Sequence, residues 1–323
     1  MAQAPAVSVL IPVYNRESLL GPCVESALAQ TVTDIEVIVC DNASTDDTWA
    51  VCEQYAARDS RVRIHRNAEN LGPVGNWLAC LERAKAPLVK LLFSDDLLKP
   101  DYLERTSSLM QNPELGFVFT AAEFVDGEQR GIGAPAYAMN HWPEQVDSAE
   151  YLKTAIQGSG LPLSPGAALF RTDDLRRSLL PGLQGVRVDE FTQTGAGIDL
   201  LCFLLTAQRY PRIAHLAEPL TQFREHPGSI SSSRAGLVRA QYLEARIWFC
   251  KQHAPEYLPE LLAEAWWVHQ LGCGRWQSFS ALRRDYGLRA EQARMGRKAW
   301  RMLLRFVSRQ LRGKNARLKE QHG

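Results

Sequence analysis

Two adjacent carboxylates, Asp95 and Asp96, follow the almost wholly apolar run at residues 88–93. Such a run is typical of a strand buried on both faces of a parallel sheet. Ligands of open α/β sheets bind outside the carboxyl ends of the strands, where an Asp pair can hold a divalent cation that in turn holds a phosphate. An isolated Asp pair more often fills a turn or caps a helix, so the metal interpretation depends on the surrounding sequence.

Strands and helices alternate at short intervals before this pair. Strand patterns occur at residues 7–11, 35–40 and 62–65, and helical spacing separates them. The alternation predicts a parallel, doubly wound sheet with right-handed crossovers, whose first strand is ended by Pro12. The loops at residues 12–16, 41–48 and 94–99 leave carboxyl ends of strands, so we expect them to converge on one crevice. The sequence contains neither a GxGxxG dinucleotide fingerprint nor a GxxxxGK[ST] P-loop.

Four segments carry a family resemblance, namely VSVLIPVYN at 7–15, DNASTDDT at 41–48, NLGPVGN at 70–76 and SDDLLKPD at 94–101. In order and spacing this chain resembles the family 2 glycosyltransferases, which are inverting nucleotide-sugar transferases of GT-A fold. The resemblance implies an α/β, mostly parallel sheet flanked by helices. One departure is Phe93, because many members carry another Asp at that position.

The resemblance also implies a donor site. Asp96 would ligate Mg²⁺ or Mn²⁺, and Asp95 would contact the ribose or share the metal. Tyr14 would stack on the base or line its pocket, and Asp41 would accept a hydrogen bond from the base. The other residues that the resemblance assigns to the donor site are Pro12, Asn15, Arg224 and His226.

Asp199 is the candidate catalytic base. It stands near the start of the apolar helix predicted around residues 198–205, where the backbone dipole favours an acidic residue whatever its function. Family members carry their base at such a helix start, and the segment PLTQFREHPGSISSS at 219–233 also resembles a family signature. By resemblance His226 faces the diphosphate or completes the metal site. Arg224 either pairs with phosphate or pins the loop to a carboxylate.

The domain interpretation has two parts. Residues 1–233 form the GT-A domain, with a nucleotide-sugar half at 1–125 and an acceptor half at 126–233, and residues 234–323 form a helical C-terminal extension. Residues 283–320 hold thirteen Lys or Arg and three acidic residues, a net +10, so the rest of the chain carries −9. Helical spacing puts Trp300, Leu304, Val307 and Leu311 opposite Arg301, Arg305, Arg309 and Arg312. This pattern suits a helix on anionic lipid, and equally a solvated helix packed on its own domain; no motif supports nucleic acid.

Composition indicates a folded protein of a reducing compartment. The seven cysteines are scattered and never spaced as CxxC, which argues against a disulfide framework or a zinc site. Neither a signal peptide nor a membrane-spanning run is evident, so we expect a cytoplasmic enzyme, peripheral on the membrane if the tail binds lipid. The resemblance implies bacterial polysaccharide or lipid-linked glycan synthesis. The alternatives are a nucleotidyl- or phospho-transferase on a related fold, and a catalytically silent sugar-binding scaffold suggested by Phe93.

Overall fold

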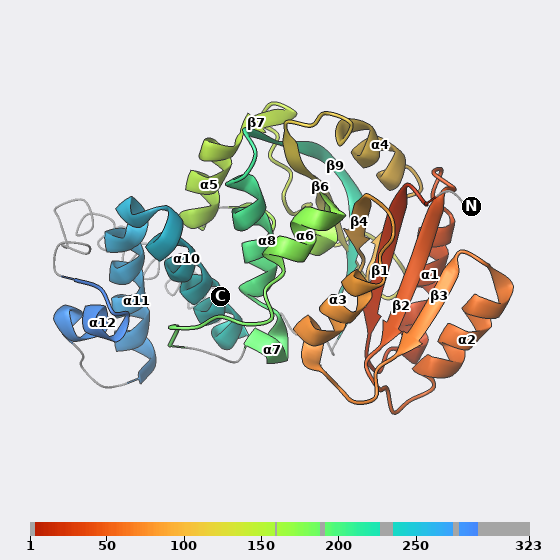
Figure 1. The fold of residues 1–323 in the computed structure, drawn as a ribbon, viewed down its shortest axis with the longest axis horizontal. Coiled ribbons are helices and arrows are strands. Elements are labelled where there is room, and N and C mark those ends of the chain that lie inside the picture. Colours follow the sequence, from red (N-terminus) through yellow and green to blue (C-terminus); the bar gives the residue numbers. More distant parts are fainter. Residues whose placement is uncertain (1–3, 159, 188–190, 227–234, 274–277, 290–323) are drawn as a thin grey trace, which may run out of the picture. The chain divides into compact units, whose positions relative to one another are not determined.

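The computed structural model describes residues 4–158, 160–187, 191–226, 235–273 and 278–289 (Figure 1). The chain forms two compact units. The first contains Met1–Gly182 and Glu190–Arg239, and the second contains Leu183–Asp189 and Ala240–Gly323.

A mixed sheet is the centre of the first unit. Among the described residues it runs in the order β3-β2-β1-β4-β8-β6-β9-β5, and β7 pairs with β9. β1 to β4 are mutually parallel, whereas β8 is antiparallel to β4 and β6. The strands are β1 Val7–Val13, β2 Ile35–Asp41, β3 Val62–Arg66, β4 Leu88–Leu91, β5 Leu97–Leu98, β6 Leu115–Val125, β7 Gln145–Asp147, β8 Ala168–Arg171 and β9 Arg212–Arg224.

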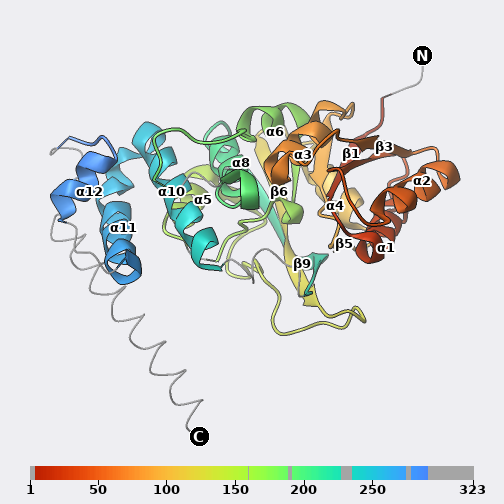
Figure 2. The ribbon, with the colours of Figure 1, turned by 90° about the horizontal axis from the view of Figure 1, so that it is seen from below.

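Helices cover both faces of this sheet. Figure 2 shows α1 and α2 on one side and α3 and α6 on the other. The expected α/β sheet flanked by helices is therefore confirmed. The helices of this unit are α1 Glu17–Leu28, α2 Thr48–Arg58, α3 Gly72–Glu82, α4 Tyr102–Leu109, α5 Ser148–Ile156, the short η1 Pro165–Ala167, α6 Thr172–Ser178, α7 Phe191–Thr194 and α8 Ile198–Ala207.

Pro12 does not end the first strand, because β1 continues to Val13. The pairing of β1 with β4 stops at Leu10, whereas its pairing with β2 continues through Pro12 and Val13. Beyond Leu10, β1 thus has a single neighbour, and a residue without a backbone N–H is tolerated there. The sequence did not predict this, because the position at which β1 loses its second neighbour depends on where β4 ends, far along the chain.

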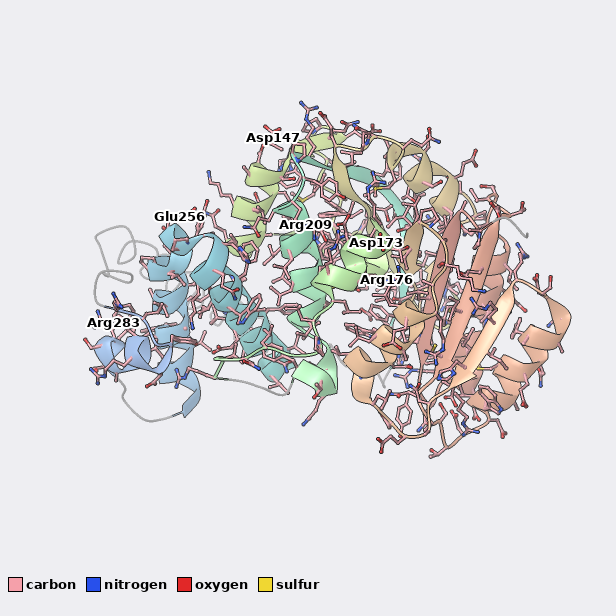
Figure 3. All side chains as sticks on the ribbon, viewed as in Figure 1. Asp147, Asp173, Arg176, Arg209, Glu256 and Arg283 are labelled. Carbon is pink, nitrogen blue, oxygen red and sulfur yellow. The ribbon has the colours of Figure 1, made fainter. Side chains whose placement is uncertain are left out.

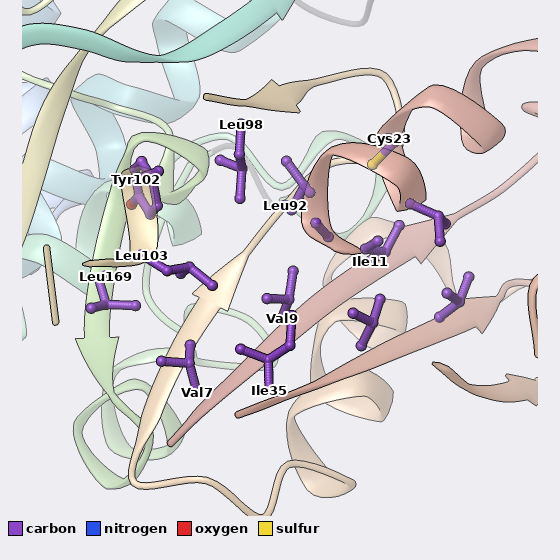
Figure 4. Close-up of a cluster of buried hydrophobic side chains, with 14 of the residues drawn as sticks. Val7, Val9, Ile11, Cys23, Ile35, Leu92, Leu98, Tyr102, Leu103 and Leu169 are labelled. Carbon is purple, nitrogen blue, oxygen red and sulfur yellow. The ribbon is translucent and has the colours of Figure 1, made fainter. Parts of the chain in front are cut away.

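The core of the first unit lies between β1 and α1. Val7, Val9 and Ile11 alternate along β1 on one face and are fully buried (Figure 4). Cys23 of α1 and Leu92, just after β4, complete this part of the cluster. Each buried aliphatic side chain of this size stabilises the fold by about 1.5–3 kcal/mol, so the cluster fixes the strand ends that carry the loops.

Acidic side chains join α6 to the end of α8. Asp174 is 3% exposed and accepts a hydrogen bond from the Tyr210 hydroxyl at 2.6 Å. Arg209, labelled in Figure 3 beyond α8, lies 3.8 Å from the same carboxylate. Asp173, its neighbour, is exposed and pairs with Arg176 at 3.0 Å (Figure 3). The contacts of Asp174 anchor the C-terminal end of α8.

The second unit is helical. Its elements are α10 Ala235–His253, which begins in the first unit, η2 Pro255–Tyr257, α11 Leu258–Cys273 and α12 Phe279–Asp285. Inside it, buried Glu244 accepts hydrogen bonds from the Tyr286 hydroxyl at 2.5 Å and from the Arg187 backbone at 3.2 Å. No described helix is long and apolar enough to cross a lipid bilayer. The basic tail at residues 301–312 lies outside the described residues.

Candidate active site

The loops after β1 and β2 are bonded to each other. The Asn15 backbone N–H donates to Ser44 Oγ at 2.9 Å, and the Thr45 N–H donates to Asn15 Oδ1 at 2.8 Å. Asn15 adopts φ +49°, a conformation that asparagine tolerates better than most residues. Tyr14 is 41% exposed between these loops, whereas Pro12 is buried within β1. The predicted convergence of the first two loops is therefore observed, and Tyr14 is accessible to a ring stacked on it.

Asp41 is fully buried beneath these loops. Its carboxylate accepts hydrogen bonds from the Ser44 N–H at 3.1 Å and from the Ser44 hydroxyl, and it pairs with Arg66 at 3.1 Å. Asp41 therefore holds the second loop in shape. Its predicted contact with a nucleotide base remains a prediction.

The third loop, after β4, is held by β9 and the residues that follow it. His226 Nε2 lies 2.9 Å from Asp95 Oδ2. The Arg224 guanidinium donates to the backbone carbonyls of Asp95, of Ser94 at 3.2 Å and of Leu19 at 2.7 Å. Arg224 thus holds the loop in place, which was one of its two expected roles. It does so by hydrogen bonds to backbone carbonyls and not by pairing with a carboxylate. Its contact with phosphate remains a prediction.

Asp96 is the buried member of the pair, at 7% exposed. Burial and then the neighbouring charge of Asp95 raise its pKa well above the usual range, although Arg224 and Lys90 oppose this. Lys90 is fully buried in β4; its ammonium group donates to the Gly166 carbonyl and lies 4.3 Å from the centre of the Tyr102 ring. Burial lowers the pKa of Lys90 to about 7. Additional positive charge near Asp96 would favour its ionised form.

Phe93 fills the position where many family members have an Asp. Its ring lies 5.4 Å from that of Trp77, which is 6% exposed, and a Cβ at Gly166 would come within 3.1 Å of it. Trp77 in turn supports the segment before α8, because a Cβ at Gly195 would lie 2.2 Å from the Trp77 ring. Phe93 is therefore a packing residue that connects the β4 loop with the segment carrying Asp199.

Asp199 lies in the first turn of α8 and is 7% exposed. Its Oδ1 accepts hydrogen bonds from the backbone N–H groups of Gly197 and Leu200, each at 2.7 Å. The predicted helix start is thus confirmed, and Asp199 stabilises it. Burial first, and then the charges of Asp199 and Asp96, raise the pKa of Tyr137 to about 12.

The donor atoms near β4 suit a hard divalent cation. Asp96 offers a carboxylate, and Asp95 and His226 bring a second carboxylate and an imidazole to the same loop. Within the described residues no cluster of three or more His, Cys, Asp or Glu side chains forms a complete metal site. Mg²⁺ is commonly bound by one or two carboxylates together with substrate phosphates, so this donor set fits such an ion.

The sequence interpretation missed three residues of this region. Lys90 interrupts an apolar strand, and that interruption is a signal of a buried charge. Trp77 reads only as a helix core residue. Tyr137 lies in a stretch without any motif, and only the folded chain brings its ring against Phe223 of β9.

The family match covers the first half of the chain. The model of the family described as glycosyl transferase family 2 matches residues 8–178. The putative glycosyltransferase EpsH of Bacillus subtilis is 37% identical over 160 residues, which are 48% of this chain and 44% of EpsH. The chondroitin synthase of Escherichia coli is 35% identical over 144 residues, 43% of this chain and 21% of that enzyme. The chain thus spans less than two thirds of the length of these relatives.

Solved structures extend the likeness over most of the fold. S. aureus TarS residues 1–349, in complex with UDP-GlcNAc, superposes with a TM-score of 0.60 at 20% identity, covering 82% of this chain and 73% of that one. The GT-A fold predicted from the sequence is confirmed by this likeness. Because the family model matches more than half of the chain, this protein belongs to glycosyl transferase family 2.

Proposed function

We propose that this protein transfers a sugar from a nucleotide diphosphate donor, a UDP-sugar, to a hydroxyl of a glycan or lipid-linked acceptor, with inversion at the anomeric carbon. The observation that carries the proposal is the placement of two carboxylate groups in one unit. Asp95 and Asp96 follow β4, and Asp199 lies in the first turn of α8. Phe93 of the β4 loop packs on Trp77, against which Gly195, just before α8, closes. Such a pair of sites can bind a leaving diphosphate on one side and deprotonate an acceptor on the other.

The donor side uses the loops after β1, β2 and β4. Exposed Tyr14 offers a face for the base, Asn15 holds the first two loops together, and Arg224 fixes the backbone of the Asp pair. TarS was crystallised with UDP-GlcNAc, which supports a uridine nucleotide as the donor. Arg224 and His226 lie beside the Asp pair, where a diphosphate would bring negative charge.

Asp96 and His226 would hold a divalent cation, and Asp95 would share it or contact the ribose. A bound Mg²⁺ or Mn²⁺ would stabilise the negative charge that develops on the departing diphosphate. Burial and the neighbouring charge of Asp95 raise the pKa of Asp96, and a bound cation would favour its ionised form.

Asp199 would act as the general base. It takes the proton of the acceptor hydroxyl while the hydroxyl oxygen attacks the anomeric carbon from the face opposite the diphosphate. The new glycosidic bond forms as the bond to the diphosphate oxygen breaks. One displacement without an enzyme nucleophile inverts the anomeric configuration.

The direct test is donor binding with and without a metal. UDP, UDP-GlcNAc, UDP-glucose and UDP-glucuronate are titrated in Mn²⁺ or in EDTA, because a ligand that binds the folded state raises the melting temperature. Released UDP is measured in parallel. We expect binding that needs the metal, and its loss in Asp96→Asn without loss of stability, because the amide removes a buried charge. Asp101→Asn, in an exposed pair with Arg105, is the matched control.

Several results would contradict the proposal. Donor affinity that is unchanged by EDTA and by Asp96→Asn would remove the metal and Asp96 from the site. Binding without UDP release would favour the sugar-binding scaffold that Phe93 suggests. Release of UMP would indicate a phospho-sugar transferase, and release of a sugar 1-phosphate would indicate a nucleotidyltransferase; neither needs a base at position 199.

The proposed setting is bacterial polysaccharide synthesis at the cytoplasmic face of the membrane. The likeness to the chondroitin synthase of Escherichia coli supports a polysaccharide product. The domain division at residues 233 and 234 and the attachment of the basic tail to anionic lipid belong to the same proposal. The tail itself lies outside the described residues.

A further inference from the structure

Asn76 is a buried polar residue of α3 to which the proposed function gives no part. Its side chain is 3% exposed, at the end of the segment NLGPVGN. Its amide nitrogen donates hydrogen bonds to the Cys40 carbonyl of β2 at 2.9 Å and to the Val13 carbonyl of β1 at 3.3 Å. A carbonyl oxygen can only accept, so the nitrogen of the amide must face the two strands. One side chain thus holds the carboxyl ends of two neighbouring strands.

The end of β1 has lost one of its two neighbours. Its pairing with β4 stops at Leu10, whereas its pairing with β2 continues to Val13. The Val13 carbonyl accepts a hydrogen bond from the Asn42 N–H at 2.9 Å as well as the bond from Asn76. Asn76 therefore supports this strand end at the point where β4 no longer does.

The residues that follow these two carbonyls are the ones proposed to meet the nucleobase. Tyr14 follows Val13, and Asp41 follows Cys40. Tyr14 is 41% exposed, whereas Asp41 is fully buried and holds the second loop in shape. The spacing of the two strand ends fixes where Tyr14 stands relative to that loop. Asn76 fixes this spacing with two hydrogen bonds from one nitrogen atom.

A second buried asparagine orients the Asn76 side chain. Asn67, just after β3, donates from Nδ2 to Asn76 Oδ1 and to Asn42 Oδ1, each at 3.0 Å. Its own N–H donates to the Asp41 carbonyl at 2.8 Å. Asn42 in turn donates to Asn70 Oδ1 at 2.8 Å. Four neutral amides thus connect the carboxyl ends of β1, β2 and β3 with the start of α3, and a satisfied buried network of this kind makes the local structure rigid.

We propose that Asn76 is a positioning residue of the donor site, which sets the spacing between Tyr14 and the loop that begins at Asp41 and so the fit of the nucleobase. This inference rests on the proposed function and gives the NLGPVGN segment a part in donor binding. The loop after β4, which would bind the diphosphate, is held by Arg224 instead. Loss of the Asn76 amide should therefore weaken binding of the base and spare binding of the diphosphate.

The test compares Asn76→Ala with the matched control Gln30→Ala. Gln30 is also a carboxamide that is 3% exposed. Its Nε2 donates to the carbonyls of Ser26 at 3.1 Å and Lys99 at 2.8 Å, and its Oε1 accepts from the Leu103 N–H at 2.9 Å. Each variant thus removes a buried amide with two bonds to backbone carbonyls, but only Asn76 bonds to the ends of β1 and β2.

Inhibition constants are measured for UDP and for inorganic pyrophosphate, which lacks the base and the ribose. The substrate is the UDP-sugar of the panel that the wild type turns over fastest, in Mg²⁺ and well below the lowest melting temperature of the three proteins. We expect Asn76→Ala to weaken UDP binding about 10-fold, the effect of about one net hydrogen bond, with pyrophosphate binding unchanged. The KM for the UDP-sugar should rise while kcat stays the same, as for loss of an interaction made equally in ground and transition states.

Gln30→Ala should keep the wild-type ratio of UDP to pyrophosphate affinity. A wild-type ratio in Asn76→Ala would overturn the inference while leaving the proposed function intact. An equal change of the ratio in both variants would show a general effect of losing a buried amide and would overturn it too. If Asn76→Ala fails to fold, Asn67→Ala is the second variant, because it removes the bond that orients Asn76 and should change the ratio in the same direction. Absence of UDP release in the wild type would instead reject the proposed function itself.

Discussion

Burial controls the charges of Asp96 and Lys90 at the end of β4. Both side chains lie inside the first unit, and burial shifts both pKa values toward the neutral forms. The sequence alone predicted the Asp pair, because a motif at a strand end is a local feature. It did not predict the position of Tyr137, whose contact with Phe223 of β9 depends on the path of the chain between β6 and β7. Nor could it show that the Asp41 carboxylate accepts a hydrogen bond from Ser44 and pairs with Arg66.

Replacement of Lys90 tests its buried charge. Its pKa is about 7, against an unfolded value of about 10.5, so the unfolded chain binds the proton more tightly and stability rises with pH between these values. Lys90→Met should therefore raise the free energy of unfolding most at pH 6, by at most about 5 kcal/mol, and the gain should vanish near pH 10.5. Urea unfolding from pH 6 to 10 measures it, with exposed Lys153→Met as control. A gain in the free energy of unfolding that does not change with pH would show that the pKa of Lys90 is not lowered in the folded protein.

The Asp199→Asn variant distinguishes the proposed role of Asp199 as a general base from its role in stabilising the start of α8. The Asn oxygen can still accept from Gly197 and Leu200, so we expect little change in melting temperature or donor affinity. Transfer should fall about 100- to 10,000-fold, which is roughly 3 to 5 kcal/mol of barrier. Asp173→Asn, also in a first helical turn, is the control. A lowered melting temperature with near-normal transfer would direct the search to Asp189 and Glu190, outside the described residues.

The segment that carries Asp199 depends on the fit between α3 and the residues before α8. The Thr192 carbonyl of α7 lies 2.5 Å from where a Cβ of Gly72 would be, and Gly195 closes onto Trp77. Strand and helix periodicity predicted most of β1 to β4 and the helices between them. It could not predict α7 or this fit, because four residues carry too little periodic signal and the contacts join distant parts of the chain.

Gly195→Ala tests this fit. Gly195 has φ +76°, and a Cβ would come 2.2 Å from Trp77, whose ring is held by Phe93. We expect a loss of about 2–4 kcal/mol in stability from strain and overpacking, with reduced transfer because Asp199 is displaced. Gly133→Ala has a similar φ of +69° and open space around its Cβ, so it should cost only about 1 kcal/mol. Equal effects of the two variants in thermal unfolding and transfer would show that Trp77 does not position the segment.

The chain forms two compact units, and the sequence does not predict all of the residues that belong to each. Residues 183–189 belong to the second compact unit although they precede α7 and α8 in the chain. The sequence interpretation instead places the domain boundary near residue 234, where the helical spacing of apolar residues becomes continuous. The net positive charge of residues 283–320 is a sequence feature that falls mostly outside the described residues.

The basic tail is tested on lipid. The full chain should float with vesicles containing anionic lipid at low salt and dissociate as salt rises, because exposed charge attraction is screened. A chain ending near residue 294 should stay unbound in the same flotation experiment. Equal recovery of the long and short chains would exclude the tail as the attachment site.

The anomeric configuration of the product tests the central claim most directly. With an α-linked UDP-sugar as donor, a single displacement assisted by Asp199 must give a β-linked product. Proton NMR of the transfer product, read from the anomeric coupling constant, distinguishes the two linkages. We predict the β-linkage from the wild-type enzyme, and from Asp199→Asn the same product formed about 100- to 10,000-fold more slowly. An α-linked product would contradict the account, because retention requires a different arrangement of groups around the reacting carbon.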